Sequence, residues 1–262
     1  HGDILQAVDQ AQDRDEFLDI APHEWLAARE DDDRVADRDD VVHDLADLLD
    51  AEPLHGTVGI GHTRWATHGE PNDVNAHPHT DPSGKFVVVH NGIIENYKEL
   101  RDQLIQQGYQ FTSQTDTEVI AHLVDKYYQD DLLQAVLKAT AELQGAFALA
   151  IISSDAPQQL VACRKGSPLV LGLGFEENFV ASDVSALLPV TSRFIYLEEG
   201  DFVLLDGSDY QVFDREGKAK QLDIKVSELT TDAVLKGNYR HYMLKEIHEQ
   251  SKAISECLEG RI

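Results

Sequence analysis

Two residues of this sequence carry opposite charges and could bind the two ends of an amino acid. Arg64 lies in an expected loop, and Asp116 lies near the start of an expected helix. A guanidinium group binds a carboxylate through two parallel hydrogen bonds, and a carboxylate can hold an ammonium group. On spacing alone, an exposed arginine and a helix-capping aspartate are the commoner explanation. The pair therefore indicates an amino-acid site without establishing one.

A second candidate is the dipeptide Asn91-Gly92, which follows the apolar run Phe86–Val89. An asparagine side-chain amide and a glycine N–H can both donate to the oxyanion of an acyl transfer, and losing one such donor costs about 3 kcal/mol. The same dipeptide is one of the commonest signals for a β-hairpin turn. From the sequence alone, the turn is the favoured interpretation.

Several histidines crowd the same stretch: His62, His68, His77, His79 and His90. Their spacing matches no zinc pattern, and no cysteine lies nearby. Histidines in loops more often form hydrogen bonds, so we predict no metal site. The segment Gly172–Gly174 is too short for a dinucleotide-binding loop, so we also predict no cofactor.

The composition restricts the classes of function. With 262 residues, 42% of them hydrophobic, the chain can bury a full core. Its formal net charge of -26 disfavours binding to nucleic acid or anionic membranes, which require clustered Lys and Arg. We find no apolar run long enough to span a membrane and no signal peptide. Two widely separated cysteines, Cys163 and Cys257, favour a cytoplasmic setting.

The acidic residues are unevenly distributed along the chain. Residues 1–40 are dense in Asp and Arg, contain no lysine and show neither helical nor strand periodicity. We expect this segment to be a disordered acidic arm. Val41–Leu49 has the apolar spacing of a short helix. The remaining pattern predicts one main domain over residues 41–225 and a linker over residues 226–262, toward an absent further domain.

Hydrophobic periodicity predicts the elements that must position the candidate residues. Helical spacing predicts helices over 96–107, 115–128 and 131–143. Thr115 or Asp116 could cap the second helix, with Glu118 as the acid of a capping box. Apolar runs separated by turn residues predict strands over 57–60, 86–90, 146–152, 159–164, 169–173, 178–181, 193–197 and 201–205. Strands, then helices, then strands indicate an α+β domain with stacked layers.

Four motifs, taken together, resemble those of one enzyme family. They are HTRWATHG at 62–69, NAHPH at 75–79, HNGIIEN at 90–96 and TDTE at 115–118. In this order they closely resemble the glutaminase domain of glutamine–fructose-6-phosphate aminotransferase (isomerizing), or glucosamine-6-phosphate synthase. The segment RHYMLKEI at 240–247 resembles that family's linker. The resemblance covers about residues 41–262, whereas other class II amidotransferases share only the shorter motifs.

The resemblance implies a four-layer αββα sandwich of the N-terminal-nucleophile hydrolase type. Residues 41–225 would then form a class II glutamine amidotransferase domain that hydrolyses glutamine to glutamate. The ammonia would serve to convert fructose 6-phosphate to glucosamine 6-phosphate. Fructose 6-phosphate would bind only through a sugar-isomerase domain that this sequence lacks. We expect the full-length family member to be a homodimer.

The resemblance also implies a role for individual residues. Arg64 would bind the carboxylate of glutamine, and Asp116 would bind its ammonium group. Asn91 and Gly92 would form the oxyanion hole. The remaining substrate-binding residues would be Trp65 in the closing loop and, lining the pocket, Thr67 and His68.

One feature of the family has no counterpart in this sequence. The family nucleophile is a cysteine at the mature N-terminus, and its own α-amino group acts as the base. This sequence begins His1-Gly2-Asp3, and neither of its cysteines matches that position. We therefore expect little or no glutaminase activity from this polypeptide, and we interpret residues 1–40 as an out-of-frame reading. Two alternatives stay open: a non-catalytic glutamine-binding or interaction module, and another class II amidotransferase.

Overall fold

The computed structural model of the chain describes residues 5–10, 57–62, 67–70 and 72–227, together with 244–245, 247–248 and 250. The chain divides into two compact units, His1–Val226 and Ser227–Ile262. All of the strands assigned in the structure belong to the first unit. Within the described residues, we find no helix that is long and apolar enough to cross a membrane.

The larger of two sheets has seven strands in the order β12-β11-β10-β6-β5-β4-β3. Their bounds are β3 His79–Thr80, β4 Phe86–Ile94, β5 Gly145–Ser153, β6 Ala156–Lys165, β10 Phe202–Asp206, β11 Asp209–Phe213 and β12 Ala219–Lys220. Each neighbouring pair is antiparallel. The longest uninterrupted pairing joins β4 to β5, from Phe86 opposite Ser153 to Ile94 opposite Gly145. This pairing fixes the position of Asn91 and Gly92 in the sheet.

The smaller sheet has six strands in the order β13-β9-β7-β8-β1-β2. Their bounds are β1 Leu5–Gln10, β2 Val58–His62, β7 Val170–Leu173, β8 Glu177–Ala181, β9 Arg193–Tyr196 and β13 Lys225–Val226. Strand β1 pairs in antiparallel fashion with β2 on one side and β8 on the other. It therefore joins β2, which ends at His62, to the rest of the sheet.

Three α-helices lie between β4 and β5 in the chain, a stretch that the structure describes throughout: α2 Tyr97–Gln106, α3 Glu118–Tyr127 and α4 Leu132–Ala141. Short 3-10 helices lie at Asp73–Asn75 (η1) and Val184–Ala186 (η2). The N-cap of α4 is Asp131, whose carboxylate accepts a hydrogen bond from the backbone N–H of Gln134 at 2.9 Å. Each α-helix turns an apolar face inward, with Leu100 and Leu104 as the buried residues of α2.

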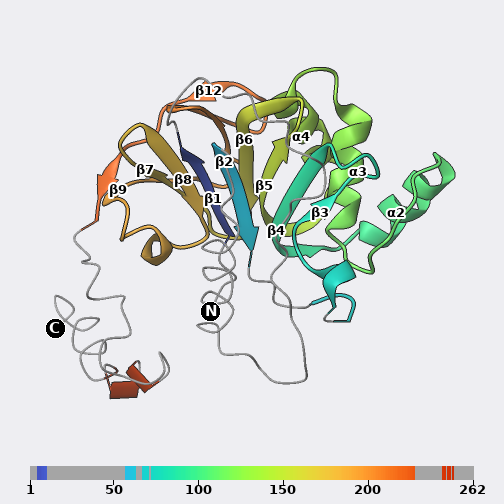
Figure 1. The fold of residues 1–262 in the computed structure, drawn as a ribbon, viewed down its shortest axis with the longest axis horizontal. Coiled ribbons are helices and arrows are strands. Elements are labelled where there is room, and N and C mark those ends of the chain that lie inside the picture. Colours follow the sequence, from blue (N-terminus) through green and yellow to red (C-terminus); the bar gives the residue numbers. More distant parts are fainter. Residues whose placement is uncertain are drawn as a thin grey trace. The chain divides into compact units, whose positions relative to one another are not determined.

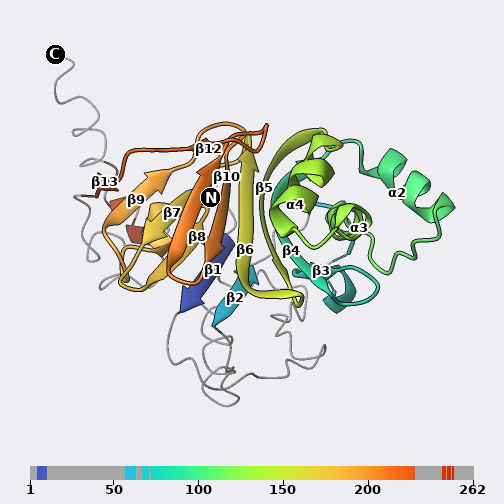
Figure 2. The same ribbon diagram turned by 90° about the horizontal axis from the view of Figure 1, so that it is seen from above.

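The larger sheet is buried on both faces. Along β4, Phe86 and Val88 contribute to a core shared with the helices, whereas Val87 and Val89 contribute to the core between the two sheets. This alternation follows from the two-residue period of a strand. Figures 1 and 2 show the resulting layers, with α3 and α4 on one side of β4–β6 and the smaller sheet on the other.

The α+β class and the stacked layers expected from the sequence are confirmed. The three predicted helices are present, with ends that differ by a few residues. The eight predicted strands are also present, as β2 and β4–β10. The sequence did not predict β3, β11, β12 or β13, which are short or contain few apolar residues.

Two local predictions were wrong. Asn91 and Gly92 do not form a hairpin turn, because they lie inside β4 opposite Ala148 and Phe147. The residue before α3 is Thr117, and its side chain makes no capping hydrogen bond. Asp116, a predicted cap, and Glu118, the predicted acid of the capping box, instead accept hydrogen bonds from backbone groups outside the helix, which are described below.

The acidic segment 1–40 has six described residues, Leu5–Gln10, and they form β1 where the sequence indicated a disordered arm. The short helix predicted over Val41–Leu49 lies outside the described residues.

Candidate active site

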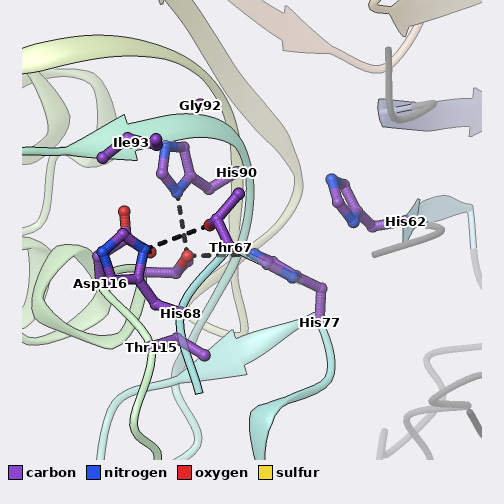
Figure 3. A pocket seen from close by; sticks show the side chains of 10 residues that line it. His62, Thr67, His68, His77, His90, Gly92, Ile93, Thr115 and Asp116 are labelled. Atoms are coloured by element: carbon purple, nitrogen blue, oxygen red, sulfur yellow. Dashed lines mark hydrogen bonds and ion pairs between the residues drawn. The ribbon is translucent and has the colours of Figure 1, made fainter. Parts of the chain in front are cut away.

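A cavity of about 240 Å³ lies where β2, β4 and the segment before α3 meet. It is smaller than the roughly 300–1,000 Å³ of pockets for drug-sized ligands, so it suits a small metabolite. Its lining residues, most of which Figure 3 labels, are His62, Thr67, His68, His77, His90, Gly92, Ile93, Thr115, Asp116 and Thr117. Four histidines and three threonines thus meet around one buried carboxylate.

Asp116 supplies that carboxylate. The residue is only 3% exposed. Oxygen Oδ2 accepts a hydrogen bond from the backbone N–H of Ile94 in β4 at 2.8 Å, and Oδ1 lies 3.7 Å from Nδ1 of His68. A carboxylate fixed in this way at a cavity wall can bind a cationic group of a ligand. The helix-cap explanation of Asp116 does not describe these contacts.

Gly92 lines the same cavity from β4. Its φ angle is +126°, and a Cβ atom at this position would lie 2.1 Å from the carbonyl oxygen of Ala146. Only glycine accommodates both the conformation and the close approach of the neighbouring strand. The structure therefore explains why a glycine stands at this point of β4.

Asn91 is buried beside Gly92 and is contacted by His62 of the other sheet. Nε2 of His62 lies 2.5 Å from Oδ1 of Asn91. Since an amide oxygen only accepts hydrogen bonds, Nε2 of His62 is the donor. The contact fixes the orientation of the amide, so that its oxygen faces His62 and its NH₂ group faces elsewhere. Sequence reasoning did not assign His62 this role, because the two residues are 29 positions apart.

Three buried histidines bind the segment that leads into α3. Nε2 of His77 lies 3.2 Å and Nδ1 of His90 lies 3.0 Å from Oγ1 of Thr117. Nε2 of His79 lies 3.0 Å from Oγ1 of Thr115. These histidines act as hydrogen-bonding partners, and within the described residues no group of His, Cys, Asp and Glu could hold a metal ion.

The environment of His90 keeps its imidazole neutral. Burial, together with the neighbouring His62, His79 and His68, lowers the pKa of His90 to about 3. A group with this pKa stays unprotonated near neutral pH and cannot act there as a general acid. His90 therefore supports the site through its hydrogen bond and its packing.

The other predicted site residues are only partly described. Thr67 lines the cavity, and its Oγ1 lies 3.3 Å from Nδ1 of His68. The His68 ring packs edge-on against Tyr97, with 5.1 Å between centroids. Arg64 and Trp65 lie outside the described residues. Thr67, His68, Gly92 and Asp116 thus come together in one cavity, and Asn91 adjoins it.

Cys163 is not part of this cavity. It lies in β6, is fully buried and is a free thiol. Burial raises its pKa far above the ordinary value, so the reactive thiolate does not form at neutral pH. Among the described residues, the cavity therefore contains no cysteine nucleophile.

Comparisons with known proteins place this site in a family. Residues 62–189 match the family model described as a glutamine amidotransferase domain. The glutamine–fructose-6-phosphate aminotransferase (isomerizing) of Clostridium tetani is 50% identical over 218 residues, which cover 83% of this chain and 36% of that protein. The enzyme of the same name from Legionella pneumophila (strain Paris) is 53% identical over 223 residues, covering 84% of this chain and 37% of that protein. The chain thus spans little more than a third of the length of these relatives.

A solved structure supports the same assignment. The glutamine phosphoribosylpyrophosphate amidotransferase of B. subtilis, complexed with ADP and GMP, aligns with a TM-score of 0.53 and 26% identity. The alignment covers 61% of this chain and 35% of that chain. The sandwich of the N-terminal-nucleophile hydrolase type, expected from the motifs, is confirmed by this likeness. The chain therefore belongs to the glutamine amidotransferase domain family, in the form that glutamine–fructose-6-phosphate aminotransferases contain.

Proposed function

We propose that the cavity binds glutamine and presents its side-chain amide to the Asn91–Gly92 pair. The observation that carries this proposal is the shared cavity of Asp116, which supplies a buried anion, and Gly92, whose backbone N–H would be the donor. A carboxylate can bind the ammonium group of an amino acid, and a backbone N–H can stabilise the oxyanion that forms in acyl transfer. Strand β4 positions both groups. Gly92 belongs to this strand, and Ile94, two residues further along it, donates its backbone N–H to the Asp116 carboxylate.

The remaining roles follow the family motifs. Asp116 binds the ammonium group and Arg64 binds the carboxylate of glutamine, while Thr67 and His68 line the pocket and Trp65 lies in the closing loop. Asn91 and Gly92 form the oxyanion hole. The fixed orientation of the Asn91 amide supports this role, because the contact of its oxygen with His62 leaves the NH₂ group as the donor.

The reaction of the family is the hydrolysis of glutamine to glutamate by a cysteine nucleophile. The 262-residue sequence contains two cysteines. Cys163 is buried away from the cavity, and Cys257 lies outside the described residues. We therefore propose that this polypeptide binds glutamine but releases glutamate slowly or not at all.

The wider reaction belongs to a longer protein. The names of the relatives indicate that they transfer an amino group from glutamine to fructose 6-phosphate. We propose that this chain supplies the glutamine-binding part of such an enzyme, and that the full-length protein is a cytoplasmic homodimer. A purine- or asparagine-pathway class II amidotransferase is the alternative, and the segment RHYMLKEI at 240–247 argues against it.

Isothermal titration calorimetry with glutamine tests the proposal. We expect saturable binding, and we expect it to weaken by about tenfold or more in Asp116→Asn, since one charge-assisted contact is lost. A parallel assay of glutamate release separates binding from turnover. Binding without release would support a binding module, and release at a rate normal for an amidotransferase would refute the slow-turnover proposal. Absence of binding would refute the proposed function.

A further inference from the structure

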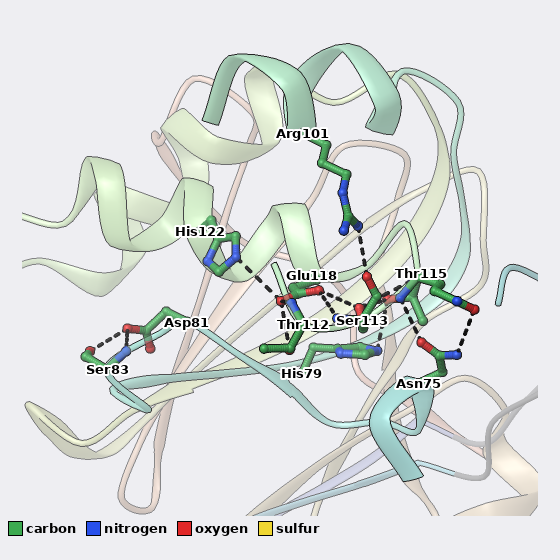
Figure 4. A network of polar contacts seen from close by, with 11 residues as sticks. Asn75, His79, Asp81, Ser83, Arg101, Thr112, Ser113, Thr115, Glu118 and His122 are labelled. Carbon is green, nitrogen blue, oxygen red and sulfur yellow. Dashed lines mark hydrogen bonds and ion pairs between the residues drawn. The ribbon is translucent and has the colours of Figure 1, made fainter. Parts of the chain in front are cut away.

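Glu118, the first residue of α3, carries a buried carboxylate outside the cavity. Oε1 accepts from the backbone N–H of Thr112 at 2.7 Å and from its hydroxyl at 3.1 Å. Oε2 accepts from the backbone N–H of Ser113 at 2.7 Å and from its hydroxyl at 2.6 Å. Nε2 of His122, one helical turn further, lies 3.7 Å from Oε1. Figure 4 shows these contacts converging on the one carboxylate.

These contacts differ from those of a helix cap. A capping carboxylate satisfies backbone N–H groups at the helix start, whereas Glu118 binds residues five and six positions earlier. Burial alone would raise the pKa of Glu118, but the contacts with His122, Ser113 and Thr112 lower it to about 2. The group is therefore ionised at neutral pH. A buried charge is costly unless its hydrogen bonds are satisfied, so this arrangement strongly restricts residues 112–113.

The restriction extends from Ser113 to the residue before Asp116. Oγ of Ser113 lies 3.1 Å from Oγ1 of Thr115 and accepts from the Thr115 backbone N–H at 3.3 Å. The Thr115 hydroxyl in turn contacts Nε2 of His79 in β3 at 3.0 Å. Asp116 follows directly in the chain, and its own carboxylate is bound by Ile94. Asp116 is thus held from β4 on one side and, through Thr115, from Glu118 on the other.

Two further elements hold the same segment. Arg101 of α2 donates to the carbonyl oxygen of Ser113 at 2.9 Å. The backbone N–H of Gln114 donates to Oδ1 of Asn75 at 2.8 Å. Glu118 binds this segment through a buried carboxylate, whereas Arg101 is only half-buried and Asp81, the other buried carboxylate in Figure 4, binds Ser83 and Phe86 instead. Removal of the Glu118 carboxylate should therefore disturb the segment more than the loss of any neutral partner.

We propose that Glu118 is the positioning residue of the ammonium subsite: it folds residues 112–115 against the start of α3 and so places the Asp116 carboxylate at the cavity wall. Glu118 does not touch the ligand. The inference rests on the proposed function, in which Asp116 binds the ammonium group of glutamine. It predicts that Glu118 affects recognition of the ammonium group and not of the rest of the ligand.

The test compares glutamine with glutaramate, which is identical except that it lacks the α-ammonium group. Calorimetry would measure the affinity of both ligands for the wild-type chain, for Glu118→Gln and for Ser113→Ala. We expect Glu118→Gln to weaken glutamine binding about tenfold and to change glutaramate binding by less than about twofold. Ser113→Ala removes one hydroxyl contact with the Glu118 carboxylate. It should also weaken the binding of glutamine and not that of glutaramate, by a smaller factor than Glu118→Gln.

Glu142→Gln is the matched control. Glu142 follows α4, binds Lys126 at 3.3 Å and has no contact with residues 112–116 among the interactions described. We expect it to leave both affinities unchanged. Circular dichroism establishes that each variant is folded, and if Glu118→Gln does not fold, Ser113→Ala decides.

The outcomes separate this inference from the proposed function. A selective loss of glutamine binding supports it. Equal losses for both ligands, or unchanged selectivity in the folded variants, would overturn it while leaving the proposed function intact. Failure of the wild-type chain to bind glutamine would overturn both.

Discussion

Replacing Gly92 with alanine would place a Cβ atom 2.1 Å from the carbonyl oxygen of Ala146, at a φ angle of +126°. Backbone strain and overpacking together should lower the free energy of unfolding by about 3 kcal/mol or more. Urea unfolding of the variant measures this loss.

Gly59 in β2 provides the matched control for this change. It has no atom within 4 Å of an added Cβ. Gly59→Ala should therefore change stability by less than about 1 kcal/mol. Equal stability of Gly92→Ala and the wild-type chain would show that the β4–β5 pairing is not as described.

His62 is a second residue whose effect can be measured, because its contact fixes the Asn91 amide. His62→Ala should allow the amide to rotate and should weaken glutamine binding by about fivefold. If His62 acts through Asn91, the same change should have little further effect in the Asn91→Ala background. Calorimetry on the four members of this double-mutant cycle tests the coupling. Additive losses would show that His62 acts independently of Asn91.

For individual residues, the family motifs predicted more than the residue spacing did. The family motifs assign Thr67, His68, Gly92 and Asp116 to one site, and these four residues line one cavity in the structure, while their roles stay predictions. The spacing alone favoured a turn for Asn91-Gly92, because the hairpin signal is local and the pairing with β5 is not. The contact between His62 and Asn91 could not be predicted, since it joins two sheets.

Whether a helix or strand could be predicted also depended on whether its sequence signal is local or long-range. Helices α2–α4 were predictable because each buries a stripe with helical period. Strand β4 was predictable as an apolar run, and the structure explains this run by burial on both faces. Strand β11 (DYQVF) lies beyond β10 and exposes several residues, so its sequence has no distinct strand pattern. Its pairing with β10 is what makes it a strand.

Strand β4 also carries a titratable group that should make stability depend on pH. Burial and the neighbouring His62, His79 and His68 lower the pKa of His90 to about 3, from an ordinary value of 6.5. Below pH 6.5 the unfolded chain binds a proton that the folded chain does not, so stability falls as the pH falls toward 3. Lowering the pH from 7 to 5 should therefore reduce the free energy of unfolding by about 2 kcal/mol through His90. Above pH 7, His90 should have almost no effect on stability.

Urea unfolding of the wild-type chain and of His90→Gln at both pH values tests this expectation. The loss between pH 7 and pH 5 should be smaller in the variant by about the same 2 kcal/mol. An identical loss in both proteins would assign the pH dependence to other groups.

For the whole molecule, the position of the site within the chain determines which segment can be deleted without loss of glutamine binding. Every residue that lines the cavity belongs to the unit His1–Val226. Both cores also consist of residues in this unit. A compact unit with its own core can fold without the segment that follows it.

A chain that ends at Val226 should therefore keep the thermal unfolding transition of the full chain. It should also bind glutamine with an affinity within about twofold of that of the full chain. Calorimetry and thermal unfolding of the two chains make the comparison. A loss of binding with the fold retained would show that residues 227–262 complete the cavity, and a loss of the transition would show that they are part of the fold.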